Sequence, residues 1–172
     1  MGGGGAASVE GRKPLTEIRV ANAPIPAMEV AMSRVYFAYG SNMNPAQMKR
    51  RCPDSRALAK ARIRGYRLAI NARGVATIVP DETSYVSGIL WKISKTDEFK
   101  LDHFEGVQSG KYEKKKMRIS VGKDSASALV YVDCVSDAGI PREGYLEKII
   151  SGAKFFGLGR KYISNLERLA YA

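Results

Sequence analysis

Three strand-like runs follow one another between residues 62 and 93, and their close spacing limits the fold more than any other feature. The runs RIRGYRLAIN (62–71), VATIVP (75–80) and YVSGILWKI (85–93) are rich in β-branched, aromatic and other apolar side chains. The breakers between them, NARG and PDETS, predict antiparallel neighbours. Further strands are predicted at 34–39, 112–121 and 126–134. No regular crossover helices separate the strands, which argues against a doubly wound parallel sheet.

Two helices are predicted from capping residues. Asn44 and Pro45 are suited to the N-cap and the first turn of a short helix that ends near Cys52. Ser94, three residues before Asp97, approximates a capping box. The helix after Ser94 should stop at a glycine suited to the left-handed conformation. That glycine is Gly106, and the helix offers for burial Phe99, Leu101 and Phe104.

Two more helices are predicted near the C-terminus, where apolar residues recur at steps of three or four. The apolar positions are Tyr145, Ile149, Ala153 and Phe156 in one helix, and Tyr162, Leu166 and Leu169 in the next. The sequence therefore predicts a mixed α/β (α+β) domain. Helices would surround a mainly antiparallel sheet that is curled or closed into a small barrel.

The 172 residues divide into a tail and one domain. Residues 1–33 begin MGGGGAAS and show no sustained period, so we predict a flexible tail, followed by one folded domain over 34–172. The charges of the tail sum to zero, so the net charge of +11 belongs to the domain. This surplus attracts anions. Its basic runs, KRR (49–51) and KKK (114–116), are not interleaved with aromatics, so we expect a solvated surface and no dedicated nucleic-acid site.

Several classes of protein do not fit the sequence. No apolar run reaches the roughly 18 residues of a membrane helix, and no secretory signal is visible. Cys52 and Cys134 are too few for a disulfide framework and lack metal-binding spacing, so we expect reduced thiols in a cytoplasmic protein. His103 is the single histidine, which argues against a histidine-rich metal site or a Ser-His-Asp triad.

The turn Gly40-Ser41-Asn42 lies between a predicted strand and a predicted helix. Glycine allows a sharp turn and a close approach of backbone to ligand. Consecutive amides in such a turn can bind a carboxylate or an oxyanion. A simple corner of the fold would have the same sequence, and the turn alone does not separate the two interpretations.

Glu105 lies at the predicted end of a helix, directly before Gly106. The negative end of the helix dipole disfavours a carboxylate there, and partial burial beside Phe104 would act in the same direction. Both effects would raise the pKa of Glu105 toward the range of a general acid or base. The alternative is a solvent-facing glutamate. Tyrosines 112, 131 and 145 could likewise point into a pocket or pack in the core.

Two segments in this order resemble the gamma-glutamylcyclotransferase family: YFAYGSN (36–42) and LDHFEGVQSGKY (101–112). Weaker similarity continues in GYLEKIISGAKFFGL (144–158) and LVYV (129–132). The resemblance implies a barrel-like mixed fold. It also implies conversion of a γ-glutamyl amino acid or amine to 5-oxoproline with release of the amine, with no metal or other cofactor.

The resemblance also assigns roles to individual residues. It implies that Glu105 is the catalytic acid/base. The implied substrate-binding residues are Tyr36, Phe37, Ala38, Tyr39, Gly40, Ser41 and the adjoining Asn42, with Tyr145 in contact with substrate and Tyr112 and Tyr131 in support. The related glutathione-specific enzymes have a different residue at the position of Asn42, which makes glutathione a less favoured substrate.

Three alternatives stay open at this point. Ser41 could act as a covalent nucleophile, although no histidine lies in its turn. The same fold could serve a non-catalytic binding protein with a basic surface. A related cyclotransferase could remove a γ-glutamyl group from a specialised amine in a biosynthetic pathway. The sequence does not identify the leaving amine and does not decide whether the chain forms a homodimer.

Overall fold

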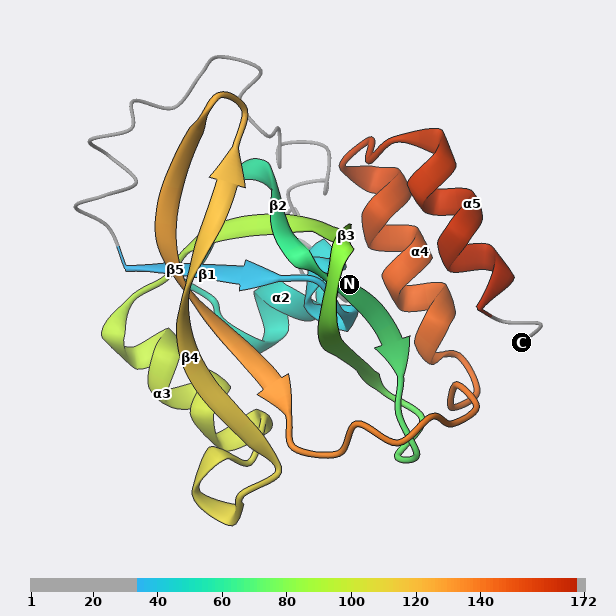
Figure 1. Cartoon of the computed structure of the whole chain (residues 1–172). Helices are drawn as coiled ribbons and strands as arrows, with labels where there is room; N and C mark the ends of the chain where they lie inside the picture. The colour runs from blue at the N-terminus through green and yellow to red at the C-terminus, as the bar shows by residue number, and fades with distance from the viewer. Residues whose placement is uncertain (1–33, 170–172) are drawn as a thin grey trace, which may run out of the picture.

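Five strands form a closed barrel in the order β1-β3-β2-β4-β5 (Figure 1). The computed structural model describes residues 34–169. Antiparallel pairing joins β1 to β3, β3 to β2, β2 to β4 and β4 to β5, and the barrel closes where β1 lies parallel to β5. The mixed, mainly antiparallel barrel is confirmed. The strands are β1 (Val35–Ala38), β2 (Arg56–Ile70), β3 (Ala76–Lys92), β4 (Tyr112–Val121) and β5 (Asp124–Asp133).

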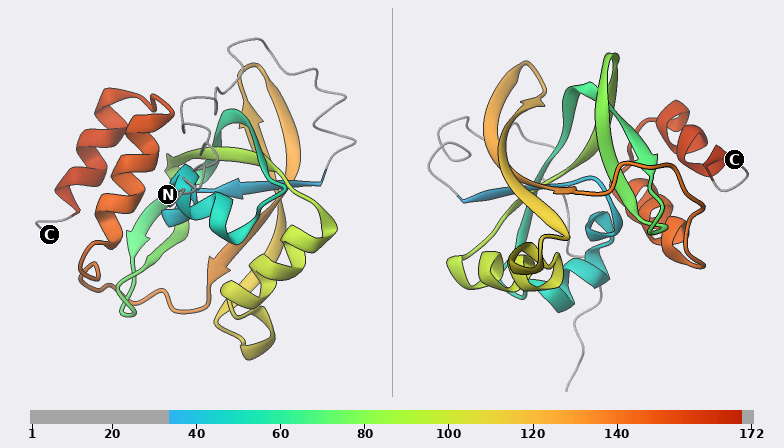
Figure 2. Two further views of the ribbon diagram at one scale, coloured as in Figure 1. Left: turned by 180° about the vertical axis from the view of Figure 1, so that it is seen from behind. Right: turned by 60° about the horizontal axis from the view of Figure 1, so that its bottom comes forward.

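Helices flank the barrel on opposite sides. Figures 1 and 2 show α4 and α5 side by side on one side, and α3 on the other. The short η2 and α2 follow β1 directly, and η3 joins α3 to β4. The bounds are η2 (Ser41–Met43), α2 (Pro45–Arg51), α3 (Lys95–Phe104), η3 (Val107–Ser109), α4 (Tyr145–Phe155) and α5 (Arg160–Arg168).

One hydrophobic core fills the barrel and the spaces beneath the helices. All four residues of β1 are buried, as expected for a strand paired on both sides. Fully buried side chains from other elements include Ile63, Ile89, Ile119 and Ile149. This core holds β1 rigidly, and therefore fixes the position of the turn that follows it.

The predicted strands 75–80 and 85–93 are one strand, β3, and the prediction of a break at PDETS is wrong. Both halves of β3 pair with β2, and the register shifts between Arg64/Tyr85 and Tyr66/Pro80. Asp81 accepts hydrogen bonds from Thr83 N (3.1 Å), Thr83 Oγ1 (2.8 Å) and Ser84 Oγ (2.8 Å). The extra residues therefore satisfy their polar groups locally as a bulge, and the strand continues.

The predicted caps are confirmed. Asn44 caps α2 by accepting from Gln47 N at 3.0 Å, and Ser94 with Asp97 forms a capping box on α3. Gly106 has the left-handed φ of 64°. The expectation that Phe99 and Phe104 are buried is wrong: they are 71% and 53% exposed. Asp97 and Leu101, four residues apart, form the buried face of α3, so the two phenylalanines point elsewhere.

The predicted tail, residues 1–33, lies outside the described residues, so the domain boundary at residue 34 stays a prediction. Between residues 34 and 169, no helix is long and apolar enough to cross a membrane.

Candidate active site

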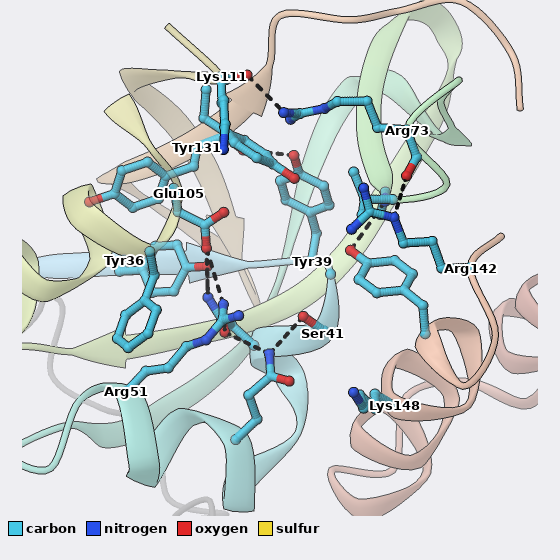
Figure 3. A pocket seen from close by; sticks show the side chains of 18 residues that line it. Tyr36, Tyr39, Ser41, Arg51, Arg73, Glu105, Lys111, Tyr131, Arg142 and Lys148 are labelled. Carbon is cyan, nitrogen blue, oxygen red and sulfur yellow. Dashed lines mark hydrogen bonds and ion pairs between the residues drawn. The ribbon is translucent and has the colours of Figure 1, made fainter. Parts of the chain in front are cut away.

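A cavity of about 330 Å³ lies where the end of β1, the end of α3 and the start of α4 meet (Figure 3). This volume is within the usual range for small-ligand pockets. Most of its lining residues carry polar side chains, and Glu105 is the one carboxyl group among them. The cavity is lined by Tyr36, Tyr39, Gly40, Ser41, Asn42, Gln47, Arg51, Arg73, Val75, Ala76, Phe104, Glu105, Lys111, Tyr112, Tyr131, Arg142, Tyr145 and Lys148.

The turn after β1 forms one wall of the cavity. β1 ends at Ala38, Gly40 is the N-cap residue of η2, and η2 begins at Ser41. A Cβ atom on Gly40 would lie 3.2 Å from the hydroxyl oxygen of Tyr145, so glycine allows this tyrosine to approach the backbone closely. The Tyr145 hydroxyl accepts a hydrogen bond from Ala76 N at 3.1 Å. The start of α4 is therefore tied both to the turn and to the start of β3.

Glu105 enters the cavity from the C-cap position of α3. Its side chain is only 13% exposed. Asn42 Nδ2 donates to Glu105 Oε1 at 3.2 Å, and a guanidinium nitrogen of Arg51 lies 3.4 Å from the same oxygen. The left-handed Gly106 ends the helix directly after Glu105, which leaves the carboxyl group at the tip of α3 facing the turn.

Burial raises the pKa of Glu105 above its ordinary value, while Arg51 and the hydrogen bond from Asn42 partly oppose that rise. The net direction is upward because loss of solvation outweighs the cation at 3.4 Å. The structure therefore agrees with the prediction from the sequence that burial raises the pKa of Glu105. A carboxyl group in a cavity whose pKa is raised by burial is better suited to accept and return a proton than an exposed carboxylate.

Asn42 links Glu105 to three other side chains. Its Nδ2 also donates to the Tyr36 hydroxyl at 3.0 Å. Its Oδ1 accepts from Gln47 Nε2 at 3.0 Å and from Arg51 at 2.9 Å. Because Asn42 is buried and satisfied on both ends, the position of its amide toward Glu105 is fixed. The Arg51 guanidinium also lies 5.0 Å from the centre of the Phe104 ring.

Substitution of Arg51 should raise the pKa of Glu105 further. Arg51→Met removes the cation that favours the charged carboxylate, so the carboxyl group should hold its proton to higher pH. A ¹³C NMR titration of the Glu105 carboxyl carbon measures this shift. Arg50→Met removes a neighbouring exposed arginine outside the cavity lining, and should leave the pKa of Glu105 unchanged. A pKa that falls or stays constant in Arg51→Met would contradict the assigned electrostatics.

The cavity tyrosines are held as neutral hydroxyl groups. Burial raises the pKa of Tyr36, Tyr39, Tyr112, Tyr131 and Tyr145. Tyr39 donates to the backbone carbonyl of Tyr131 at 2.6 Å, and the Tyr131 hydroxyl donates to Asp102 at 2.6 Å. Tyr39 and Tyr131 therefore connect β1 to β5 and β5 to α3.

Further cationic side chains line the cavity, and Arg142 and Lys148 lie on the side across from Glu105 (Figure 3). Arg73 forms an ion pair with the buried carboxylate of Asp133 and lies 5.1 Å from the centre of the Tyr112 ring. Arg142 Nε donates to the Arg73 carbonyl at 2.6 Å. Lys148 of α4 completes this side, whereas Lys111 lies near Glu105, and its backbone amide donates to the Gly106 carbonyl at 3.1 Å. The cavity therefore joins a protonatable carboxyl group to a positively charged rim.

The structure brings nine of the eleven residues chosen from the sequence to this one cavity. Phe37 and Ala38 do not line it; both are fully buried in the barrel core. His103 is exposed in the last turn of α3 and does not line the cavity.

Sequence reasoning missed the cationic residues of the site. Arg51 was read as part of a solvated basic run. Its spacing of four from Gln47 on α2 could have indicated a shared face toward the turn. Arg73, Lys111 and Arg142 come from loops, and no pattern in the sequence places them together. Lys148 follows Tyr145 by three residues on α4, which does indicate a shared helix face.

Comparison with known proteins shows which family the chain resembles in sequence. A sequence model of the AIG2-like family matches residues 85–166. Gamma-glutamylcyclotransferase from Homo sapiens is 30% identical over 149 residues, covering 80% of this chain and 79% of the human protein. The Mus musculus protein of the same name is 29% identical over 147 residues, 78% of each chain.

The fold gives the same result. A solved structure of a gamma-glutamyl cyclotransferase is 28% identical and superposes with a TM-score of 0.74 over 78% of this chain and 86% of that one. Sequence and fold agree over most of both chains, and the chain therefore belongs to the gamma-glutamylcyclotransferase family.

Proposed function

We propose that this protein is a gamma-glutamylcyclotransferase that converts a γ-glutamyl amino acid or amine to 5-oxoproline and releases the free amine. The observation that carries the proposal is the buried Glu105, with its raised pKa, beside the turn at residues 40–42 in one cavity. The family membership supports it. The mechanism uses groups that the chain itself supplies.

Glu105 serves as the acid/base. The α-amine of the glutamyl group attacks its own γ-carbonyl, which forms a carbon–nitrogen bond and closes a five-membered ring. The γ-carbon then releases the leaving amine. An ammonium cannot attack and an unprotonated amine leaves poorly, so Glu105 accepts a proton from the α-amine and delivers one to the leaving nitrogen. Such proton transfer typically contributes about 10²- to 10⁴-fold to the rate.

The turn and the tyrosines hold the glutamyl chain folded. Amides at the start of a helix have no acceptor within the helix, so those at the start of η2 are suited to the substrate carboxylate or the polarised γ-carbonyl. Tyr36, Tyr39, Asn42 and Tyr145 shape the pocket, supported by Tyr112 and Tyr131. Phe37 and Ala38 act from the core by fixing the strand that carries the turn. Holding a near-attack geometry lowers the barrier further.

The geometry disfavours Ser41 as a covalent nucleophile. Gln47 Nε2 donates to Ser41 Oγ at 2.6 Å, and an amide cannot remove the hydroxyl proton. No imidazole lies among the described residues that line the cavity. In this mechanism Ser41 contributes to the shape and polarity of the turn, and Glu105 moves the protons.

The basic surface does not require a nucleic-acid partner. Arg51 of the KRR run faces Glu105, and Lys114 of the KKK run pairs with Glu98 (2.9 Å) and Asp102 (2.7 Å). Each run is therefore partly neutralised by carboxylates of the same chain, which supports the prediction that no dedicated nucleic-acid site is present. The free thiols of Cys52 and Cys134 support a cytoplasmic location.

Product analysis tests the proposed function. Purified protein is incubated with a panel of γ-glutamyl amino acids, γ-glutamyl amines and glutathione, and 5-oxoproline and free amine are measured by mass spectrometry. We expect equal amounts of the two products from at least one γ-glutamyl amino acid, and little from glutathione. Absence of 5-oxoproline from the whole panel would favour a non-catalytic binding protein.

A further inference from the structure

The side of the cavity opposite Glu105 is lined by cationic side chains. Glu105 lies at the tip of α3, while Arg142 and Lys148 come from other elements and lie across the cavity from it, and Lys111 lies near Glu105 (Figure 3). Together with Arg51 and Arg73, five cationic side chains line a cavity that contains one carboxyl group. An excess of this kind selects for negative charge in the ligand.

Only part of this positive charge is balanced within the protein. Arg51 lies against Glu105, and Arg73 pairs with the buried carboxylate of Asp133. Among residues 34–169, no ion pair with a carboxylate is formed by Lys111, Arg142 or Lys148. Arg142 is nevertheless held in place, because its amide donates to Gly74 O at 3.0 Å and its Nε donates to Arg73 O at 2.6 Å.

Lys111, Arg142 and Lys148 leave the cavity with three positive charges that no carboxylate of the described residues balances. The charge of a γ-glutamyl substrate can be compared with this excess. The glutamyl group carries an α-ammonium and an α-carboxylate, so its net charge is zero. A neutral amine as leaving group leaves the excess unchanged, and a monocarboxylic amino acid reduces it by one. An acidic amino acid brings two carboxylates and reduces the excess the most.

We propose, on the basis of the proposed function, that the site prefers γ-glutamyl substrates whose leaving group is a dicarboxylic amino acid such as aspartate or glutamate. Arg142 and Lys148 bind the carboxylates of the leaving group. Lys148 lies on the same face of α4 as Tyr145, so it follows the wall of the pocket outward from the turn. The glutamyl half then lies between the turn and Glu105, and the leaving group extends toward the cationic rim.

An isosteric pair of ligands isolates the charge. γ-Glutamyl-aspartate and γ-glutamyl-asparagine have nearly the same shape and differ by one negative charge. Binding is measured by calorimetry in a Glu105→Gln background, so that turnover does not interfere. We expect the aspartate compound to bind about tenfold more tightly at low salt, because this is the effect that a few partly exposed charge contacts produce. The ratio of the two dissociation constants should be smaller at high salt, which screens those contacts.

Variants assign the preference to the rim. Arg142→Met combined with Lys148→Met should bring the ratio of the two dissociation constants close to one. Arg64→Met combined with Lys123→Met removes the same net charge from exposed positions outside this cavity, and should preserve the ratio. Equal binding of both compounds would overturn the proposal. So would a ratio that survives the rim substitutions, or one that both double variants abolish.

Failure of this inference is distinguishable from failure of the proposed function. The protein with Glu105 intact could form 5-oxoproline from both compounds while the Glu105→Gln protein binds the two compounds equally. In that case the proposed function stands and the dicarboxylate preference falls. If neither compound is turned over while the ratio and its loss in the rim variant are observed, the preference stands and the cyclotransferase function falls.

Discussion

Glu105→Gln is expected to lower kcat by about 10³-fold while substrate still binds. Glutamine has nearly the shape of glutamate and can still accept the hydrogen bond from Asn42 Nδ2, so the pocket should keep its form. It cannot accept a proton from the α-amine or return one to the leaving nitrogen. Release of 5-oxoproline under saturating substrate measures kcat, and calorimetry measures binding.

The control for this substitution is Glu82→Gln. Glu82 is an exposed glutamate in the β3 bulge, outside the cavity lining, and its substitution should leave kcat unchanged. Near-normal turnover by Glu105→Gln would remove Glu105 from the mechanism. Equal losses in both variants would show that the effect is not specific to the cavity carboxyl group.

Gly152→Ala should destabilise the protein and weaken substrate binding together. A Cβ atom at residue 152 would lie 2.5 Å from the carbonyl carbon of Met43 and 2.7 Å from the backbone nitrogen of Asn44. These are backbone atoms at the end of the turn, so α4 must move away. Overpacking typically lowers the free energy of unfolding by about 1–3 kcal/mol, and we expect a loss near the upper end of that range. Alanine is favoured over glycine in a helix by only ~1 kcal/mol, so the net effect should still be destabilising.

The expected readouts are a Tm lower by about 5 °C and a raised KM. The KM should rise because α4 carries Tyr145, whose hydroxyl lies close to Gly40. Ser151→Ala changes the adjacent, exposed position of the same helix, removes only the long hydrogen bond from Asn44 Nδ2 (3.5 Å), and should affect Tm and KM far less. A Gly152→Ala protein with unchanged Tm and unchanged KM would contradict the close packing of α4 on the turn.

Local signals in the sequence were sufficient for much of the fold. Asn44, Ser94 and Gly106 mark helix ends because capping depends on a few neighbouring atoms. PDETS failed as a break because a bulge and a turn have the same composition, and only the pairing of both halves of β3 with β2 separates them. Phe99 and Phe104 failed because hydrophobicity alone does not define the buried face of a helix.

The candidate site was predictable where one segment contains the chemistry. The turn at 40–42 and Glu105 both follow from local arguments, and the family resemblance joined them. Arg73 and Arg142 were not predictable, since their contact depends on a hydrogen bond between loops 69 residues apart. The charge of a rim assembled from loops depends on tertiary structure and has no periodic signal in the chain.

The isotopic composition of the product tests the central claim most directly. The protein is incubated with a γ-glutamyl amino acid that it accepts in water enriched in ¹⁸O, and the products are analysed by mass spectrometry. Attack by the substrate's own α-amine brings in no oxygen from water, so the account predicts unlabelled 5-oxoproline in an amount equal to the released amine. Glutamate carrying ¹⁸O as the main product would show hydrolysis by water and would contradict intramolecular cyclisation.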